Sequence, residues 1–215
     1  MEAMKTDMAG GASVLAAIGA IARLKLKANV TAIIPAVENL PGGGAYRPGD
    51  VFKAMNGTNV EVITTDAEGR LILADALAYA ESKIKAKRIV DVATLTGACI
   101  IALGIICTGA FTNNQELMDK VLVAAKAAGE HVWQMPMFDE YKEQLKSYVA
   151  DVRNVGGRPA GSITAAVFLQ GFVGETPWVH LDIAGTSTSE IERGYISKGA
   201  TGTPVATLVN LALSL

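Results

Sequence analysis

Hydrophobic and polar positions along the chain predict alternating strands and helices, and the two patterns meet most clearly at residues 59–77. This stretch begins with the alternation typical of a strand, in which apolar Val60 and Ile63 stand among polar or smaller residues. It ends with apolar residues at roughly helical spacing, from Leu71 to Leu77. Between the two patterns lies T-T-D-A-E-G-R, which is too acidic and too small to form part of a core. This junction is therefore the first candidate for chemistry.

Elsewhere, short apolar runs alternate with segments of helical periodicity. This alternation predicts an α/β fold with a largely parallel sheet that is covered on both faces. A hairpin turn is expected at N-G-T (residues 56–58). The main expected strands are residues 29–37, 59–63, 88–95 and 178–185, and the expected helices are residues 12–24, 71–77, 114–128, 139–147, 162–173 and 204–215. The apolar tract at residues 98–107 is expected to be a buried helix or strand. Because there is no internal repeat and no linker, residues 1–215 are expected to form a single domain.

Composition and charge narrow the class of protein. Hydrophobic residues make up 50% of the chain and charged residues 19%, which is typical of a folded globular protein. A net charge of −2 argues against binding to nucleic acid, which needs clustered Lys and Arg side chains. No apolar run reaches the roughly 18 residues of a membrane span, so no membrane partner is expected. Cys99 and Cys107 lie in apolar surroundings typical of reduced core residues, which fits a cytoplasmic location.

The junction at residues 64–70 carries the side chains best suited to chemistry. If residues 66–70 are extended, Asp66, Glu68 and Arg70 point to the same face, at the carboxyl end of a strand where α/β sheets bind ligands. A D-x-E pair can chelate one divalent cation while the Glu bridges to a second, and a nearby arginine can hold an anion or stabilise negative charge. The alternative is a surface turn in which Glu68 and Arg70 simply form an ion pair.

Other catalytic chemistries find less support. There is no G-x-S-x-G motif for a serine nucleophile, and no C-x-x-C or H-E-x-x-H pair for zinc. The only histidines are His131 and His180, and His180 lies in an apolar strand as a core histidine would. Asp7 precedes an apolar helix, where an acidic residue most often caps the helix or complements its dipole. The residue types alone therefore favour a metal-assisted hydrolase.

Many segments resemble the leucine aminopeptidase (cytosol aminopeptidase) family, in its C-terminal catalytic domain. The run T-D-A-E-G-R-L, followed by L-A-D-A-L and D-V-A-T-L-T-G-A, is closely similar to the family signature N-T-D-A-E-G-R-L. Further segments match in order: M-K-T-D-M-A-G-G-A, P-A-V-E-N-L-P, Y-R-P-G-D-V, W-Q-M-P-M, A-D-V-R-N, H-L-D-I-A-G and G-A-T-G-T-P. The resemblance covers nearly the whole chain. It implies a mixed, largely parallel sheet sandwiched between helices, in a protein that usually assembles as a homo-oligomer, a hexamer of two trimers.

The resemblance also implies a metal centre and a catalytic group. Asp66 and Glu68 match metal ligands, with Glu68 bridging two divalent cations (Mn²⁺ or Zn²⁺). Asp7 matches a ligand of the second cation, a role that replaces the capping interpretation. Arg70 matches the catalytic arginine that holds a bicarbonate-like anion, which acts as the general base toward the attacking water.

Substrate-binding residues follow from the same motifs. Thr94 and Leu95 match residues whose backbone groups position the substrate, and Met4 matches part of the pocket for the N-terminal side chain. The implied activity is hydrolysis of N-terminal residues, leucine in particular, from peptide substrates. The cations acidify the water and stabilise the negative charge that develops on the scissile carbonyl.

The chain departs from the family pattern in two places. Thr64 stands where the signature usually has Asn, a change expected to tune the site. The family also supplies a lysine and an aspartate from an upstream V-G-K-G-x-x-F-D-[ST]-G-G segment, then a second lysine, and the sequence begins after them. Residues 1–215 are therefore expected to be the later part of a catalytic domain, without the N-terminal domain and the first catalytic segment. The alternative is a non-catalytic remnant that keeps the fold and the oligomer interface as a binding or structural subunit.

The chain by itself is expected to be inactive or nearly so. In the family the absent aspartate bridges the two cations and the absent lysine completes the second cation's site, so Asp7 and Glu68 alone should hold that cation at low occupancy. The test is hydrolysis of leucine anilide by the purified chain saturated with Mn²⁺ or Zn²⁺, beside a full-length family member. Turnover within about tenfold of that control would show that the chain finds its ligands elsewhere.

Overall fold

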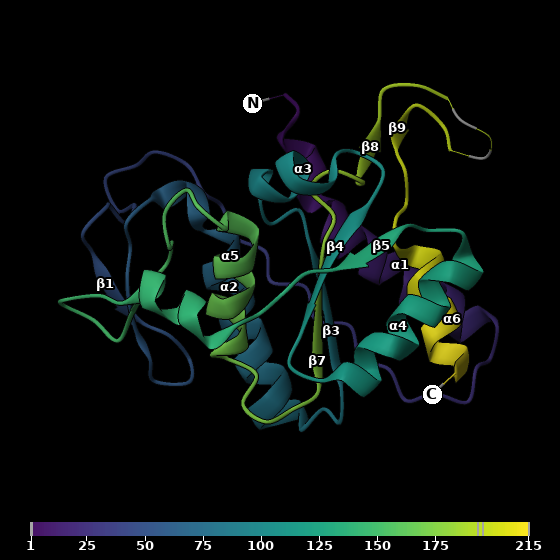
Figure 1. Ribbon diagram of the computed structural model, residues 1–215, viewed down its shortest axis with the longest axis horizontal. Helices are drawn as coiled ribbons and strands as arrows, with labels where there is room; N and C mark the ends of the chain where they lie inside the picture. The colour runs from purple at the N-terminus through teal and green to yellow at the C-terminus, as the bar shows by residue number, and fades with distance from the viewer. Residues whose placement is uncertain (1, 193, 195, 215) are drawn as a thin grey trace. The chain divides into compact units, whose positions relative to one another are not determined.

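The computed structural model describes residues 2–192, 194 and 196–214, which divide into two compact units (Figure 1). The first unit comprises Met1–Ile34, Val90–Met135 and Trp178–Leu215, and the second comprises Pro35–Ile89 and Pro136–Pro177. Each unit is therefore assembled from segments that are far apart in the sequence. Met1 and Leu215, the ends of the expected domain, lie outside the described residues.

A four-stranded sheet organises the first unit. Its strands, in spatial order, are β3 (Ile89–Ala93), β7 (Trp178–Asp182), β4 (Thr108–Thr112) and β5 (Val132–Gln134). Strands β7 and β4 are antiparallel, whereas β4 and β5 are parallel. Strand β3 runs parallel to β7, because the Ile89 amide donates to the Pro177 carbonyl and the Ile183 amide donates to the Ala93 carbonyl, each at 2.9 Å. The sheet is thus mixed and largely parallel, as the sequence predicts.

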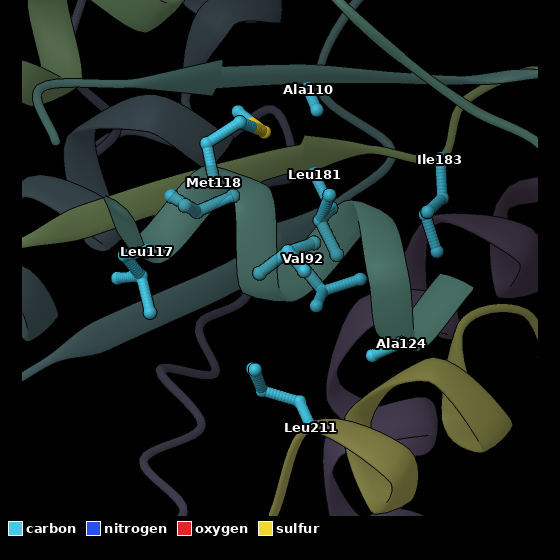
Figure 2. Close-up of a cluster of buried hydrophobic side chains, with 10 residues drawn as sticks. Val92, Ala110, Leu117, Met118, Ala124, Leu181, Ile183 and Leu211 are labelled. Carbon is cyan, nitrogen blue, oxygen red and sulfur yellow. The ribbon is translucent and has the colours of Figure 1, made fainter. Parts of the chain in front are cut away.

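One face of this sheet forms the core of the first unit with three helices. These are α1 (Ala9–Arg23), α4 (Gln115–Ala128) and α6 (Val205–Ser214), and α6 packs against both of the others. Val179, Leu181 and Ile183 are two residues apart, so their side chains share a face of the sheet. They join Met118 of α4 and Leu211 of α6 in one buried cluster (Figure 2).

Helix α4 shows how the sequence sets a local element. Its cap is Asn114, whose side-chain oxygen accepts a hydrogen bond from the Leu117 amide at 2.9 Å. Gly129 ends the helix in the left-handed conformation that favours glycine. Met118 is fully buried, whereas Val123 on the other side of the helix is 70% exposed. The buried apolar residues of α4 therefore form the face that packs on the sheet.

Shorter elements complete the first unit. They are the 3₁₀ helix η1 (Met4–Met8), the helix α3 (Gly97–Leu103) and the paired strands β8 (Thr188–Ser189) and β9 (Gly199–Ala200). Helix α3 begins at Thr96, whose hydroxyl accepts from the Cys99 amide at 3.0 Å.

The second unit contains a three-stranded sheet with the order β1 (Val51–Lys53), β2 (Asn59–Glu61) and β6 (Val152–Arg153). Strands β1 and β2 form the antiparallel hairpin predicted around N-G-T, and β6 pairs in parallel with β2. The helical segments are η2 (Thr65–Ala67), α2 (Gly69–Tyr79), the π-helical turn η3 (Ala80–Ile84), η4 (Asp139–Leu145) and α5 (Gly161–Gln170). Helices α2 and α5 pack against each other.

One expected strand is absent. Residues 29–37 lie outside every strand of the described chain. Pro35 interrupts this apolar run, and proline has no N–H to donate to a sheet. The other expected strands and helices are present with somewhat different bounds, and the helix expected at residues 139–147 is the 3₁₀ helix η4.

Two apolar segments are only partly buried, and for residues 98–107 this corrects the expectation of a buried helix or strand. Helix α1 buries Ala17 and Ile21 on one face but exposes Leu15 on another, so it is not buried all round. Residues 98–107 bury Cys99, yet Ile101 is 88% exposed. Within the described part of the chain, no helix combines the length and apolarity needed to cross a membrane.

Met118→Ala is expected to lower the free energy of unfolding by about 2–5 kcal/mol, because it leaves a cavity among buried side chains. Val123→Ala, on the exposed side of the same helix, is the matched control and should change that free energy by less than about 0.5 kcal/mol. Urea denaturation of both variants makes the comparison. Equal losses would contradict the packing of this face of α4 on the sheet.

Candidate active site

The acidic segment of the second unit is helical, which corrects the expectation that residues 66–70 are extended. Thr64 is still extended (φ −140°, ψ 137°), but η2 follows it and leads through Glu68 into α2. The Thr64 hydroxyl accepts from the Asp66 amide at 3.4 Å, a local bond by which threonine starts a turn. Helical residues two apart do not face each other, so alternation does not align Asp66, Glu68 and Arg70.

Arg70 is held inside the second unit. It lies in the first turn of α2, is only 7% exposed, and donates from Nη1 to the backbone carbonyl of Asn154 at 2.8 Å. A surface turn would leave the guanidinium in solvent, so Arg70 is not the exposed residue of that alternative, whereas an ion pair between Glu68 and Arg70 stays a hypothesis. Burying a charged group costs free energy unless it is hydrogen-bonded or paired. The hydrogen bond to Asn154 therefore restricts the orientation of the buried Arg70 guanidinium.

The two carboxylates of this segment are more accessible, Asp66 being exposed and Glu68 half-buried. Burial, and to a smaller extent the charge of Glu68, raises the pKa of the Tyr46 hydroxyl. Tyr46 Oη and Asn39 Nδ2 each donate to the Thr65 carbonyl at 3.4 Å. Sequence reasoning missed both side chains as site residues, although they belong to the segments Y-R-P-G-D-V and P-A-V-E-N-L-P that carry the family resemblance.

Asp7 and Thr94 meet in the first unit. Gly10 of α1 lies so close to the Val92 carbonyl that a Cβ at this position would collide with it. This close approach places η1 beside the end of β3, where Thr94 Oγ1 donates to the Asp7 carboxylate at 2.7 Å. The N-cap of α1 is Met8, without a side-chain cap bond, so the capping interpretation of Asp7 is wrong.

Asp182 fixes the loop that follows β3. Its Oδ1 accepts from the amides of Leu95 (3.1 Å), Thr96 (3.4 Å) and Ala184 (3.1 Å), and its Oδ2 accepts from the Thr96 hydroxyl at 2.7 Å. Burial raises the pKa of Asp182, although the charge of His180 and these hydrogen bonds act in the opposite direction. Sequence reasoning missed this residue. Its only local signal is the segment H-L-D-I-A-G.

His180 is a core histidine, as the sequence predicts. It is fully buried, and its Nδ1 lies 2.6 Å from Asp91 Oδ1. Trp178 Nε1 donates to the other oxygen of the same carboxylate at 2.6 Å, and the ring of Phe111 stacks on the imidazole. These contacts give His180 a structural role in the sheet.

The remaining candidates have different exposures. Met4 is exposed within η1, and Thr94 and Leu95 are half-buried. Because Asp7 belongs to the first unit whereas Asp66 and Glu68 belong to the second, their convergence on a cation stays a prediction.

The donor chemistry fits divalent cations, because accessible carboxylate oxygens are ligands that Mn²⁺, Zn²⁺ and similar ions accept. Within either unit taken separately, the described residues contain no group of three or more His, Cys, Asp and Glu side chains that could hold a metal.

Solved structures define the class of fold. A mutant of tomato leucine aminopeptidase matches with a TM-score of 0.91 and 44% identity, over 100% of this chain and 42% of that one. The bottromycin maturation enzyme BotP matches with a TM-score of 0.88 and 39% identity, over 97% of this chain and 46% of that one. A second structure of BotP is a complex with Mn. The fold is thus that of the leucine aminopeptidase catalytic domain, which confirms the predicted fold class.

The sequence comparisons agree. The model of the cytosol aminopeptidase family, catalytic domain, matches residues 1–209, and the chain belongs to this family. A probable cytosol aminopeptidase of Clostridium tetani is 58% identical over 97% of this chain and 44% of the relative. One of Solibacter usitatus is 57% identical over 99% of this chain and 44% of the relative. The chain spans less than half the length of these relatives.

Asp182 should make stability depend on pH in a direction set by its raised pKa. The folded state favours the protonated Asp182 carboxyl more than the unfolded chain does. The stability that this preference adds is fully present below the ordinary pKa of 3.8 and is lost as pH rises through the pKa of Asp182 in the folded state. In Asp182→Asn the group cannot ionise. The free energy of unfolding of the parent protein minus that of the variant should therefore fall as pH rises from about 4 towards neutrality. Urea denaturation at several pH values measures this difference, and a difference that rises with pH would contradict the assignment.

Proposed function

We propose that the protein is a two-metal aminopeptidase that removes N-terminal residues, leucine among them, from peptides. The observation that carries this proposal is the match of the cytosol aminopeptidase catalytic-domain model to residues 1–209, a range that contains every residue assigned to the site. The proposed activity is the one expected of the full-length relatives. This chain spans only part of their length, 44% in the case of the Clostridium tetani protein. We place the protein in the cytoplasm and expect a homo-oligomer, with the hexamer of the family as the model.

Asp7, Asp66 and Glu68 are the proposed ligands of two divalent cations, Mn²⁺ or Zn²⁺. The Mn complex of the related BotP supports this choice of chemistry. Bound cations supply Lewis acidity at a scissile carbonyl and lower the pKa of water. The Thr94 hydroxyl, which donates to Asp7, fixes the orientation of that carboxylate before any ligand binds.

Arg70 is the proposed catalytic residue, and it would hold a bicarbonate-like anion that accepts a proton during hydrolysis. A guanidinium suits this role because its planar fork of N–H groups matches the geometry of a carboxylate-like anion. Its bond to the Asn154 carbonyl restricts the orientation of the fork. Restricting the group in advance avoids reorganisation during the reaction.

Met4, Thr94 and Leu95 are the proposed substrate-binding residues. The exposed side chain of Met4 can contact an apolar N-terminal side chain such as that of leucine. Asp182 holds the backbone at Leu95 through its amide, so the neighbouring backbone groups are presented in a fixed direction. A peptide substrate would pair with such groups through its own backbone.

Arg70→Ala is expected to lower kcat for leucine anilide by about 100-fold or more, because a positioned charge-stabilising group contributes that much. Arg70→Lys is the matched control, since it keeps the charge without the planar fork, and should show a smaller loss. Steady-state kinetics with Mn²⁺ measure both, in this chain or in a longer form that contains it, whichever hydrolyses the substrate.

Unchanged kcat with reduced stability in Arg70→Ala would assign the arginine a structural role. If no form of the protein binds Mn²⁺ or hydrolyses the anilide, a non-catalytic binding or structural subunit becomes the better description. Calorimetric titration with MnCl₂ separates these outcomes without depending on turnover.

A further inference from the structure

Asn154 extends the three-stranded sheet with its side chain. Strands β2 and β6 pair up to Glu61 opposite Arg153, and the Asn154 amide donates to the Glu61 carbonyl at 2.9 Å. Beyond this point the fully buried side chain continues the pairing: Oδ1 accepts from the Ile63 amide and Nδ2 donates to the Thr64 carbonyl, each at 2.8 Å. The carboxamide has one C=O and an N–H like a peptide group, so it stands in for the next residue of the strand.

These bonds hold the chain immediately before the acidic segment. Thr64 is extended, and its hydroxyl accepts from the Asp66 amide where η2 begins. The direction in which the chain turns towards Asp66 therefore depends on where the Thr64 backbone is held. On the other side of the segment, Arg70 Nη1 donates to the Asn154 carbonyl at 2.8 Å. Asn154 thus contacts both ends of the stretch that carries Asp66 and Glu68.

We propose that Asn154 is a positioning residue for the acidic segment, which fixes the orientation of Asp66, Glu68 and Arg70 without touching the substrate. The catalytic importance of this role rests on the proposed function. The structural requirement is an amide: aspartate keeps the acceptor for Ile63 but lacks the donor for the Thr64 carbonyl, and leucine lacks both. Removing either bond leaves a backbone group of Ile63 or Thr64 without its protein partner beside a fully buried residue, and this loss destabilises the local structure.

The first test is amide hydrogen exchange on the metal-free 215-residue chain, with Asn154→Leu and Asn154→Asp. The reporter is the Leu71 amide, which donates to the Glu68 carbonyl at 2.8 Å and makes no bond to Asn154. We expect both substitutions to raise its exchange rate by about tenfold or more, since a local opening needs less free energy once the segment has lost its anchor. The Val62 amide, which donates to the Asp50 carbonyl at 2.9 Å, is the internal reference and should be unaffected.

The matched control is Asn59→Ala. Asn59 Nδ2 donates to Asp151 Oδ2 at 3.1 Å at the opposite end of the same pair of strands. This substitution weakens the sheet without touching the acidic segment, so exchange at Leu71 should stay at the parent rate. If Asn154→Leu does not fold, Asn154→Asp carries the test, because its shape and its acceptor for Ile63 are preserved.

The second test is kinetic, in whichever form of the protein hydrolyses leucine anilide, at a temperature at which circular dichroism shows every variant folded. We expect kcat to fall by about tenfold or more in both Asn154 variants while KM stays within about threefold, the pattern of a misplaced catalytic group. Folded Asn154 variants with parental Leu71 exchange and parental kcat would overturn the proposal. If Leu71 exchange rises but the parent protein neither binds Mn²⁺ nor hydrolyses the anilide, the positioning role holds and the proposed function fails.

Discussion

A backbone N–H or C=O beyond the end of a strand inside a protein must find a partner other than the neighbouring strand, and both groups of candidate residues depend on this constraint. In the first unit the partner is Asp182, whose carboxylate binds the amides of the loop after β3. In the second unit it is Asn154, whose carboxamide binds the chain after β2. In both cases the held segment carries candidate functional residues. Buried polar side chains therefore hold the backbone of both segments.

The candidate residues differ in how firmly their side chains are held. Asp66 is exposed and Glu68 half-buried, whereas Arg70 is buried and its guanidinium is hydrogen-bonded. Asp7 combines the two properties, because it is exposed but accepts a hydrogen bond from Thr94. Groups that carry fixed charge gain most from being oriented before the reaction, since no free energy is then needed to reorganise them.

Local signals in the sequence predicted what depends on local chemistry. The helix expected at residues 114–128 and the N-G-T hairpin are both present where expected. Burial was harder to predict, because an apolar residue such as Ile101 carries no information about what covers it. The extended conformation expected at residues 66–70 was wrong because the turn is set by the hydroxyl of Thr64, which an alternation of polar and apolar residues does not show.

The motifs pointed to the acidic residues and to Arg70, but not to the residues that hold them. Asp182 and Leu95 are 87 residues apart in the sequence, and Asn154 and Thr64 are 90 apart. Such contacts form only after the strands have paired, so no local pattern reveals them. Tyr46 was missed for a related reason, since its relation to Glu68 depends on the folded course of a loop rich in Gly and Pro.

The contact at Gly10 has a mechanical consequence. There the backbone of α1 rests directly on the carbonyl of Val92, with no side chain between them. Side chains between two elements can absorb a small displacement by changing rotamer, but two close-packed backbones cannot. Helix α1 and strand β3 should therefore move together as one rigid body. A change in the twist of the sheet would carry Asp7 and Thr94 along together, with the 2.7 Å bond between them intact.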